Sequence, residues 1–223
     1  MRNAFAKEMK SLTDKNKNVV LLSGDIGNRM FDELKDSNPD QFINCGIAEA
    51  NMMSMAAGMA LSGIRPIIYT ITPFTTVRCL EQIRIGVAYH EAPVIIVGTG
   101  SGLSYAELGP THHSLEDMAI IRSIPNINVC APCDKIELVY QLREAVESKI
   151  PTYIRIGKKG EPDLGLVNSS YGIGKANIVK EGKKYVLLGV GPIIGEALEA
   201  AQLLKQDGID LCIVSMGGVS PLD

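Results

Sequence analysis

An acidic residue at the start of an apolar helix is the first candidate for chemistry in this sequence. Glu49 follows a short apolar strand predicted near Phe42, and it lies in a helix predicted over 48–61 that is rich in alanine, methionine and glycine. We expect that helix to be buried, and ionised carboxylates are rarely buried without a partner. The partner can be a basic group on a ligand. Alternatively, Glu49 only complements the dipole of the first helical turn.

The second candidate is a pair of histidines at the end of a long loop. The loop is predicted over 99–113, is rich in glycine, serine and threonine, and ends in His112 and His113. Loops of this length without regular structure are more often functional than simple connections. The two side chains can instead cap the following helix or line a polar surface. Adjacent histidines rarely chelate one metal ion, so we expect no metal site here.

Cys130 and Cys133 form a C-x-x-C pattern directly before a helix predicted over 135–148. In a thioredoxin-like unit this pattern supports redox chemistry, whereas a structural zinc site needs a second, suitably spaced pair of ligands that we do not find. The simpler alternative is that Cys130 ends a strand and Cys133 lies in a turn. The odd number of cysteines, five, favours free thiols in a cytosolic chain.

Length and charge limit the classes of function. The chain has 223 residues, 46% of them hydrophobic, and a formal net charge of −3 with acids and bases mixed along its length. A nucleic-acid surface would need a basic stripe, so we expect no nucleic-acid partner. The charged N-terminus is unlike a signal peptide, and no apolar run has the length of a membrane span. We therefore expect a cytoplasmic protein without a membrane partner.

Apolar strands alternate with helices along most of the chain. Continuous apolar strands of this kind are typical of a mostly parallel sheet covered on both faces, so the predicted fold class is α/β with a doubly wound sheet. Strands are predicted at 19–23, near 42, and at 66–70, 93–98, 127–130 and 152–155, and further helices at 3–12, before 34, at 74–89 and at 115–122.

The sequence becomes polar and rich in turn residues after Gly157. We expect a first domain over 1–160, a linker that leads into a strand over 161–184, and the start of a second α/β domain over 185–223. Strands predicted at 185–189 and 211–215 and a helix at 193–205 cannot bury a core by themselves, so the second domain looks cut short. Val186 to Val190 and Ile213 would then be exposed, and self-association is expected.

In an open parallel sheet, ligands gather at the carboxyl ends of the strands. The loops predicted there carry Asp25, Glu49, the Thr72-Pro73-Phe74 turn and the loop that ends at His113. Because these loops follow strands of the same predicted sheet, we expect one ligand site at that edge.

The order of these motifs resembles the pyrimidine-binding domain of thiamin-diphosphate enzymes, and specifically the C-terminal section of transketolase. The similarity covers residues 5 to 160, and the residues near Gly195 and Ile209 resemble the start of the family's third domain. The matching motifs are Ser23-Gly24-Asp25, Gly46-Ile47-Ala48-Glu49-Ala50, Pro73-Phe74 with Glu81-Gln82-Ile83, Gly109-Pro110-Thr111-His112-His113-Ser114-Leu115-Glu116-Asp117, and Arg122-Ser123-Ile124-Pro125-Asn126-Ile127 followed by Ala131-Pro132.

The resemblance implies thiamin diphosphate as the cofactor and supplies a ligand partner for Glu49. In the family, the matching glutamate hydrogen-bonds a ring nitrogen of the cofactor's aminopyrimidine, and this favours the imino tautomer that takes the proton from the thiazolium carbon. The resemblance places Phe74 in a stack on the pyrimidine ring, with a one-residue shift in the match. It places Asp25 and Ile47 near the cofactor.

The resemblance also implies transfer of a two-carbon ketol unit between sugar phosphates. His112 would lie near the oxygens of the reacting sugar, where it helps to bind or protonate it, with His113 beside it. Lys158 lies close to the position of a basic phosphate contact in the family.

Three positions depart from the family pattern. Leu108 stands where an acid is usual, Gly100 near the place of a histidine, and Cys79 in place of a tyrosine of the pyrimidine pocket. The reaction class therefore carries over better than the identity of the substrate. The alternatives are an enzyme like 1-deoxyxylulose-5-phosphate synthase, the beta subunit of a 2-oxoacid dehydrogenase, and a non-catalytic module without its partner.

The diphosphate-binding half of the family's site is missing from this sequence. The family uses a Gly-Asp-Gly motif followed by an asparagine to hold Mg²⁺ and the diphosphate, and Gly24-Asp25-Ile26-Gly27 is not that motif. The resemblance therefore implies a partner, the N-terminal section of a transketolase, which supplies the magnesium ligands and shares each active site. A homodimer or a heterotetramer is expected.

Overall fold

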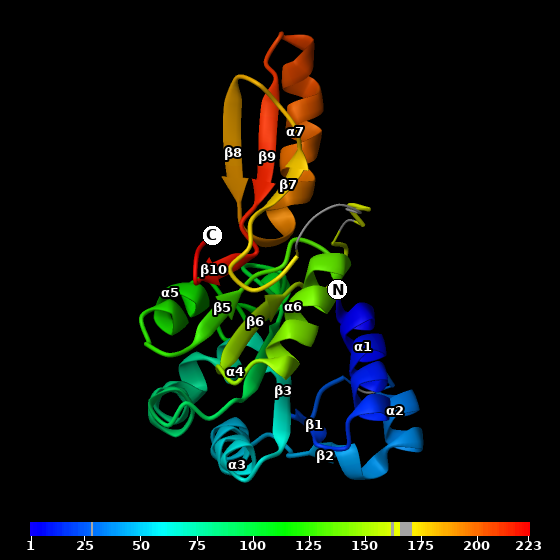
Figure 1. Cartoon of the computed structure of the whole chain (residues 1–223), viewed down its shortest axis with the longest axis vertical. Helices are drawn as coiled ribbons and strands as arrows, with labels where there is room; N and C mark the ends of the chain where they lie inside the picture. Colours follow the sequence, from blue (N-terminus) through cyan, green and yellow to red (C-terminus); the bar gives the residue numbers. More distant parts are fainter. Residues whose placement is uncertain (28, 162, 166–170) are drawn as a thin grey trace.

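A seven-stranded sheet forms the centre of the computed structural model, which describes residues 1–27, 29–161, 163–165 and 171–223 (Figure 1). The strand order is β10-β5-β6-β4-β3-β1-β2, and all neighbours are parallel except β10, which is antiparallel to β5. The prediction of a mostly parallel α/β sheet is thereby confirmed. The strands are β1 (Val19–Ser23), β2 (Phe42–Asn44), β3 (Arg65–Ile71), β4 (Ile95–Thr99), β5 (Asn128–Cys130), β6 (Thr152–Ile156) and β10 (Gly218–Ser220).

Helices cover both faces of this large sheet. Alternate residues of each strand point to opposite faces, so Leu22 packs into one buried cluster and Leu21 into the other. Residues of α3 (Glu49–Leu61), the π-helix Gln82–Tyr89 and α5 (Asp117–Arg122) belong to the cluster on the first face. Residues of α1 (Arg2–Lys15), α2 (Asp32–Ser37) and α6 (Lys135–Glu147) belong to the cluster on the second face.

The prediction of a single helix over 74–89 is wrong. The structure divides this segment into α4 (Thr72–Thr75), a 3₁₀ turn at Val77–Cys79 and the π-helix. Two threonine hydroxyls explain the interruption, because Thr75 Oγ1 and Thr76 Oγ1 both donate to the Thr72 carbonyl, at 2.9 and 2.7 Å. Side-chain bonds of this kind compete with regular helical hydrogen bonds.

A second, three-stranded sheet lies at one end of the molecule, with α7 (Ile194–Gln206) along one side (Figure 1). Its order is β7-β9-β8, with β8 parallel and β7 antiparallel to β9. The strands are β7 (Asn177–Lys180), β8 (Tyr185–Gly189) and β9 (Leu211–Ser215). Residues 162 and 166–170 of the predicted linker lie outside the described residues.

Burial in this small sheet differs from the expectation at Ile213. That side chain is fully buried, because α7 covers it with Ile194, Ala197 and Ala201. Val186 and Leu188 of β8 are exposed, each by 64%. No helix in the described part of the chain has the length and apolar character needed to cross a membrane.

Glu137 of α6 joins the two sheets through a buried carboxylate. It accepts hydrogen bonds from Asn177 Nδ2 of β7 at 2.7 Å and from Ser215 Oγ of β9 at 3.0 Å. The backbone N–H of Cys133 donates to the same carboxylate at 2.7 Å. A helix of the large sheet is therefore fixed to two strands of the small one.

Candidate active site

Glu49 lies at the carboxyl edge of the large sheet, as the first residue of α3. Its side chain is only 3% exposed, beside the carboxyl ends of β1 and β3. A Cβ atom at Gly24, which follows β1, would lie 3.5 Å from Glu49 Cγ and 3.0 Å from Thr70 Cβ. A side chain at Gly24 would thus crowd Thr70 of β3, whereas its contact with Glu49 would be an ordinary van der Waals contact.

The structure supplies Glu49 with a partner that the sequence reasoning missed. Arg78, in the 3₁₀ turn, donates from Nη1 to Glu49 Oε2 at 2.7 Å. The Arg78 guanidinium carbon lies 4.1 Å from the centroid of the Phe74 ring, so the cation also stacks on an aromatic face. An arginine between an acid and an aromatic residue is a recognisable pattern, but nothing in the sequence links positions 49 and 78.

His112 lies next to this group. Its ring is 5.1 Å from the Phe74 ring in an edge-to-face arrangement and 5.8 Å from the ring of Tyr105. Thr111 Oγ1 is 2.9 Å from His112 Nδ1, which fixes the orientation of the imidazole. His113 turns back into its own loop, with Nε2 3.4 Å from the Ala106 carbonyl oxygen.

Lys158 reaches the same loop from the end of β6. Its Nζ lies 4.2 Å from the Tyr105 ring centroid and 3.0 Å from Glu107 Oε1. A hydrogen bond with its own backbone and the bond from Lys158 lower the pKa of Glu107. Tyr105 therefore contacts both His112 and Lys158, and one ring separates the two predicted substrate contacts.

Asp25 and Ile47 lie in neighbouring loops, and among the described residues neither side chain forms a hydrogen bond or ion pair with Glu49. Asp25 is exposed, has a left-handed backbone with φ of 57°, and accepts from Asn44 Nδ2 at 2.9 Å. The Ile47 side chain is 78% exposed. The structure thus brings Glu49, Phe74 and His112 together and leaves these two residues at the rim.

The three departures from the family pattern have different surroundings. A Cβ atom at Gly100 would lie 2.1 Å from Cε2 of Tyr105, so any larger residue would displace that ring. Cys79 is buried, and desolvation, with a smaller effect of the nearby Glu49, raises its pKa to about 12. Leu108 is 49% exposed on the loop surface.

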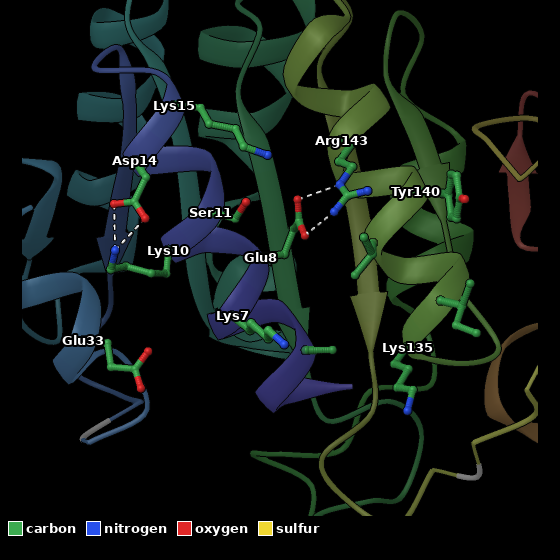
Figure 2. A pocket seen from close by; sticks show the side chains of 13 residues that line it. Lys7, Glu8, Lys10, Ser11, Asp14, Lys15, Glu33, Lys135, Tyr140 and Arg143 are labelled. Atoms are coloured by element: carbon green, nitrogen blue, oxygen red, sulfur yellow. Dashed lines mark hydrogen bonds and ion pairs between the residues drawn. The ribbon is translucent and has the colours of Figure 1, made fainter. Parts of the chain in front are cut away.

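A cavity of about 640 Å³ lies away from these residues, between α1 and α6 (Figure 2). Figure 2 shows that some of the charged side chains that line it form ion pairs with one another. Arg143 donates to both carboxylate oxygens of Glu8, at 2.7 and 2.8 Å, and Lys10 binds Asp14 at 2.7 and 2.6 Å. None of the residues that line this cavity was predicted from the sequence to take part in chemistry.

Comparison with known families identifies the class. The family model for the transketolase pyrimidine-binding domain matches residues 1–161, and the model for the transketolase C-terminal domain matches residues 174–223. The chain belongs to the transketolase family, as a section that contains the pyrimidine-binding domain.

Relatives and solved structures agree with this assignment. The chain is 30% identical to one subunit of the apulose-4-phosphate transketolase of Phocaeicola vulgatus and 34% identical to a putative transketolase C-terminal section of Methanocaldococcus jannaschii. Each match covers the whole chain and 72% of the relative. A structure described as a split gene transketolase, inactive beta4 tetramer, superposes with a TM-score of 0.89 at 31% identity, again over the whole chain and 72% of that structure.

The transketolase of Campylobacter jejuni superposes with a TM-score of 0.86 at 25% identity, over 98% of this chain and 35% of that longer chain. The family implies thiamin diphosphate, and the site fits its aminopyrimidine half. Glu49 can accept a hydrogen bond from such a ring, and Phe74 offers an aromatic face. The buried Thr70 Oγ1, which like Glu49 lies close to Gly24, has no hydrogen-bond partner among the described residues and is free to bind a ligand atom. These residues include no group of three or more acids, histidines or cysteines that could hold a metal ion.

Proposed function

We propose that this chain is the pyrimidine-binding subunit of a two-subunit transketolase, which transfers a two-carbon ketol unit between sugar phosphates. The observation that supports this most directly is the buried Glu49 at the carboxyl edge of the sheet, linked through Arg78 to the Phe74 ring and from there to His112. In this proposal residues 1–160 hold the aminopyrimidine site, and residues 185–223 begin the family's C-terminal domain.

Each residue has a separate task in the proposed reaction. When bound, thiamin diphosphate supplies a nucleophilic carbon that accepts the ketol unit. Glu49 hydrogen-bonds the ring nitrogen of the aminopyrimidine and moves a proton there. Phe74 packs against the pyrimidine ring, with Asp25 and Ile47 at the rim of the cofactor site.

The proposed substrate contacts begin at His112, whose ring lies 5.1 Å from the Phe74 ring. His112, held by Thr111, binds or protonates a sugar oxygen, and His113 supports the same loop. Lys158 binds the sugar phosphate. To do so, it gives up its ion pair with the Glu107 carboxylate and forms one with the phosphate.

A separate N-terminal subunit completes the site in this proposal and supplies the ligands of the diphosphate and Mg²⁺. Relatives that are named as a transketolase subunit and as a C-terminal section support this division, and the similar structure described as a beta4 tetramer supports an oligomer. The proposed assembly is a homodimer or a heterotetramer in which each active site is shared between chains. Five free cysteines support a cytoplasmic location.

The Glu49→Gln variant tests the proposal in a complex with the partner subunit. We expect ketol transfer to fall about 1,000-fold, because Glu49 acts in proton transfer, while the fold is retained. Glu199→Gln, on the exposed side of α7, is the control and should leave the rate unchanged. Near-normal transfer by Glu49→Gln would contradict the proposed role of Glu49.

The identity of the substrate needs a separate assay with several donors. Transfer from ketose donors should exceed any reaction with pyruvate. The donors to compare are ketose phosphates, the apulose 4-phosphate named for one relative, and the sulfonated ketose 6-deoxy-6-sulfo-D-fructose named for another. A preference for pyruvate would instead favour the synthase or dehydrogenase alternatives. Inactivity with every diphosphate-binding partner would favour a non-catalytic module. The similar beta4 tetramer is described as inactive, which is consistent with that alternative.

A further inference from the structure

The guanidinium of Arg78 makes both contacts that the proposed function assigns to the aminopyrimidine. It donates to Glu49 Oε2 at 2.7 Å, and its carbon lies 4.1 Å from the centroid of the Phe74 ring. Both groups are flat, both stack on aromatic faces, and both offer nitrogen atoms to a carboxylate. The guanidinium therefore uses the same two groups, Glu49 and Phe74, that the aminopyrimidine would need.

We propose that Arg78 competes with the cofactor for Glu49 and Phe74. In the cofactor-free chain Arg78 occupies the pyrimidine site, and its side chain moves out when the aminopyrimidine enters. This inference rests on the proposed function, since it assumes that Glu49 and Phe74 receive that ring. It makes Arg78 a residue that sets the affinity and rate of cofactor binding.

The burial of the two partners determines which one moves. The Glu49 side chain is 3% exposed, whereas the Arg78 side chain is 44% exposed. Arg78 can therefore exchange its carboxylate contact for water at a modest cost, while Glu49 cannot reach the solvent. A buried carboxylate left alone is unfavourable, so the departure of Arg78 is coupled to the arrival of another hydrogen-bonding group.

The backbone around Arg78 limits the motion to its side chain. The next residue, Cys79, is fully buried, and its Sγ lies 3.1 Å from the Phe74 carbonyl oxygen, which ties the 3₁₀ turn to α4. Across the described residues, the bond to Glu49 and the stack on Phe74 are the polar and aromatic contacts of the guanidinium. Rotation of one side chain thus opens the site without a movement of the loop.

The test measures thiamin diphosphate binding to the complex of this chain with its partner subunit. Arg78→Gln should bind the cofactor about tenfold more tightly and reach full activity with a shorter lag, because a charge-assisted hydrogen bond no longer has to be displaced. Arg84→Gln is the matched control, since Arg84 is exposed on the neighbouring π-helix. It should change neither quantity.

The Glu49→Gln background separates this inference from the proposed function. There the Arg78→Gln substitution should no longer change the affinity, because the competing ion pair is already lost. Unchanged or weaker binding by Arg78→Gln, with transfer still dependent on Glu49, would overturn the competition and leave the proposed function intact. Normal transfer by Glu49→Gln would instead contradict the proposed function itself.

A second variant keeps the inference testable if Arg78→Gln does not fold. Arg78→Lys retains a positive charge near Glu49 but lacks the planar fork that stacks on Phe74. If Arg78→Gln fails to fold, Arg78→Lys should still bind thiamin diphosphate more tightly than the unsubstituted chain. Equal or weaker binding by the lysine variant would contradict the inference.

Discussion

At the scale of the residue, Tyr105 is the side chain that connects the proposed substrate contacts. Its ring lies between Lys158 and His112, and it fills the space that the missing side chain of Gly100 leaves open. A histidine at position 100 would therefore displace Tyr105. The departure at this position replaces a polar side chain with the aromatic ring of Tyr105, so the proposed sugar site should differ in shape from that of family members with the histidine.

Lys158→Met should raise the KM for a sugar phosphate about tenfold and change kcat little. The reason is that a phosphate contact binds the ground state and the transition state alike. Steady-state kinetics of the complex with the partner subunit would measure both constants. Lys159→Met, which removes the exposed neighbouring charge, serves as the control. A fall in kcat with an unchanged KM would contradict a role limited to phosphate binding.

At the scale of the element, the C-x-x-C pattern belongs to the connection between β5 and α6. Cys130 ends the strand and Cys133 lies in the turn before the helix, which is the simpler of the two alternatives offered by the sequence. Burial, reinforced by the nearby Glu137 carboxylate, raises the pKa of both thiols. Redox motifs depend on a lowered thiol pKa, so this environment opposes redox chemistry.

Alkylation of the folded protein should therefore spare both cysteines at about pH 8. A raised pKa means that deprotonation needs a pH above the ordinary thiol value, so little thiolate forms, and burial blocks the reagent. Mass spectrometry after iodoacetamide treatment should find Cys130 and Cys133 unmodified and the half-buried Cys45 modified first. Rapid labelling of Cys133 in the native protein would refute this picture.

Local sequence patterns predict the strands better than the other elements. The apolar runs around Leu21 and Ile96 are long enough to define buried strands, and parallel pairing follows from the helices between them. The three residues Gly218–Ser220 carry no periodic signal, so the sequence does not predict β10. The contact of Glu49 with Arg78 escapes prediction for another reason, since it depends on how two distant segments fold together.

At the scale of the whole molecule, the buried Glu137 holds the small sheet against the large one. Its loss would leave Asn177 Nδ2, Ser215 Oγ and the Cys133 N–H without their acceptor. We expect Glu137→Ala to lower the free energy of unfolding by about 3 kcal/mol, because buried donors without partners are costly. Urea unfolding would measure the loss.

Hydrogen exchange would show where that loss acts. In Glu137→Ala, amides of β7 and β9 should lose protection, whereas β1 and β4 in the middle of the large sheet should retain it. Glu147→Ala, on the exposed end of the same helix, is the control. Equal protection of the small sheet in both variants would show that Glu137 does not join the sheets.

The antiparallel strand β10 has a consequence for the continuity of the polypeptide. Its Gly218 and Ser220 pair with Cys130 and Val129 of β5, although the whole small sheet lies between these strands in the sequence. The small sheet is therefore attached to the large one by backbone hydrogen bonds as well as by covalent linkage. We therefore expect the two fragments produced by cleavage after the exposed Lys159 to remain associated, and size-exclusion chromatography of the cleaved protein would test this.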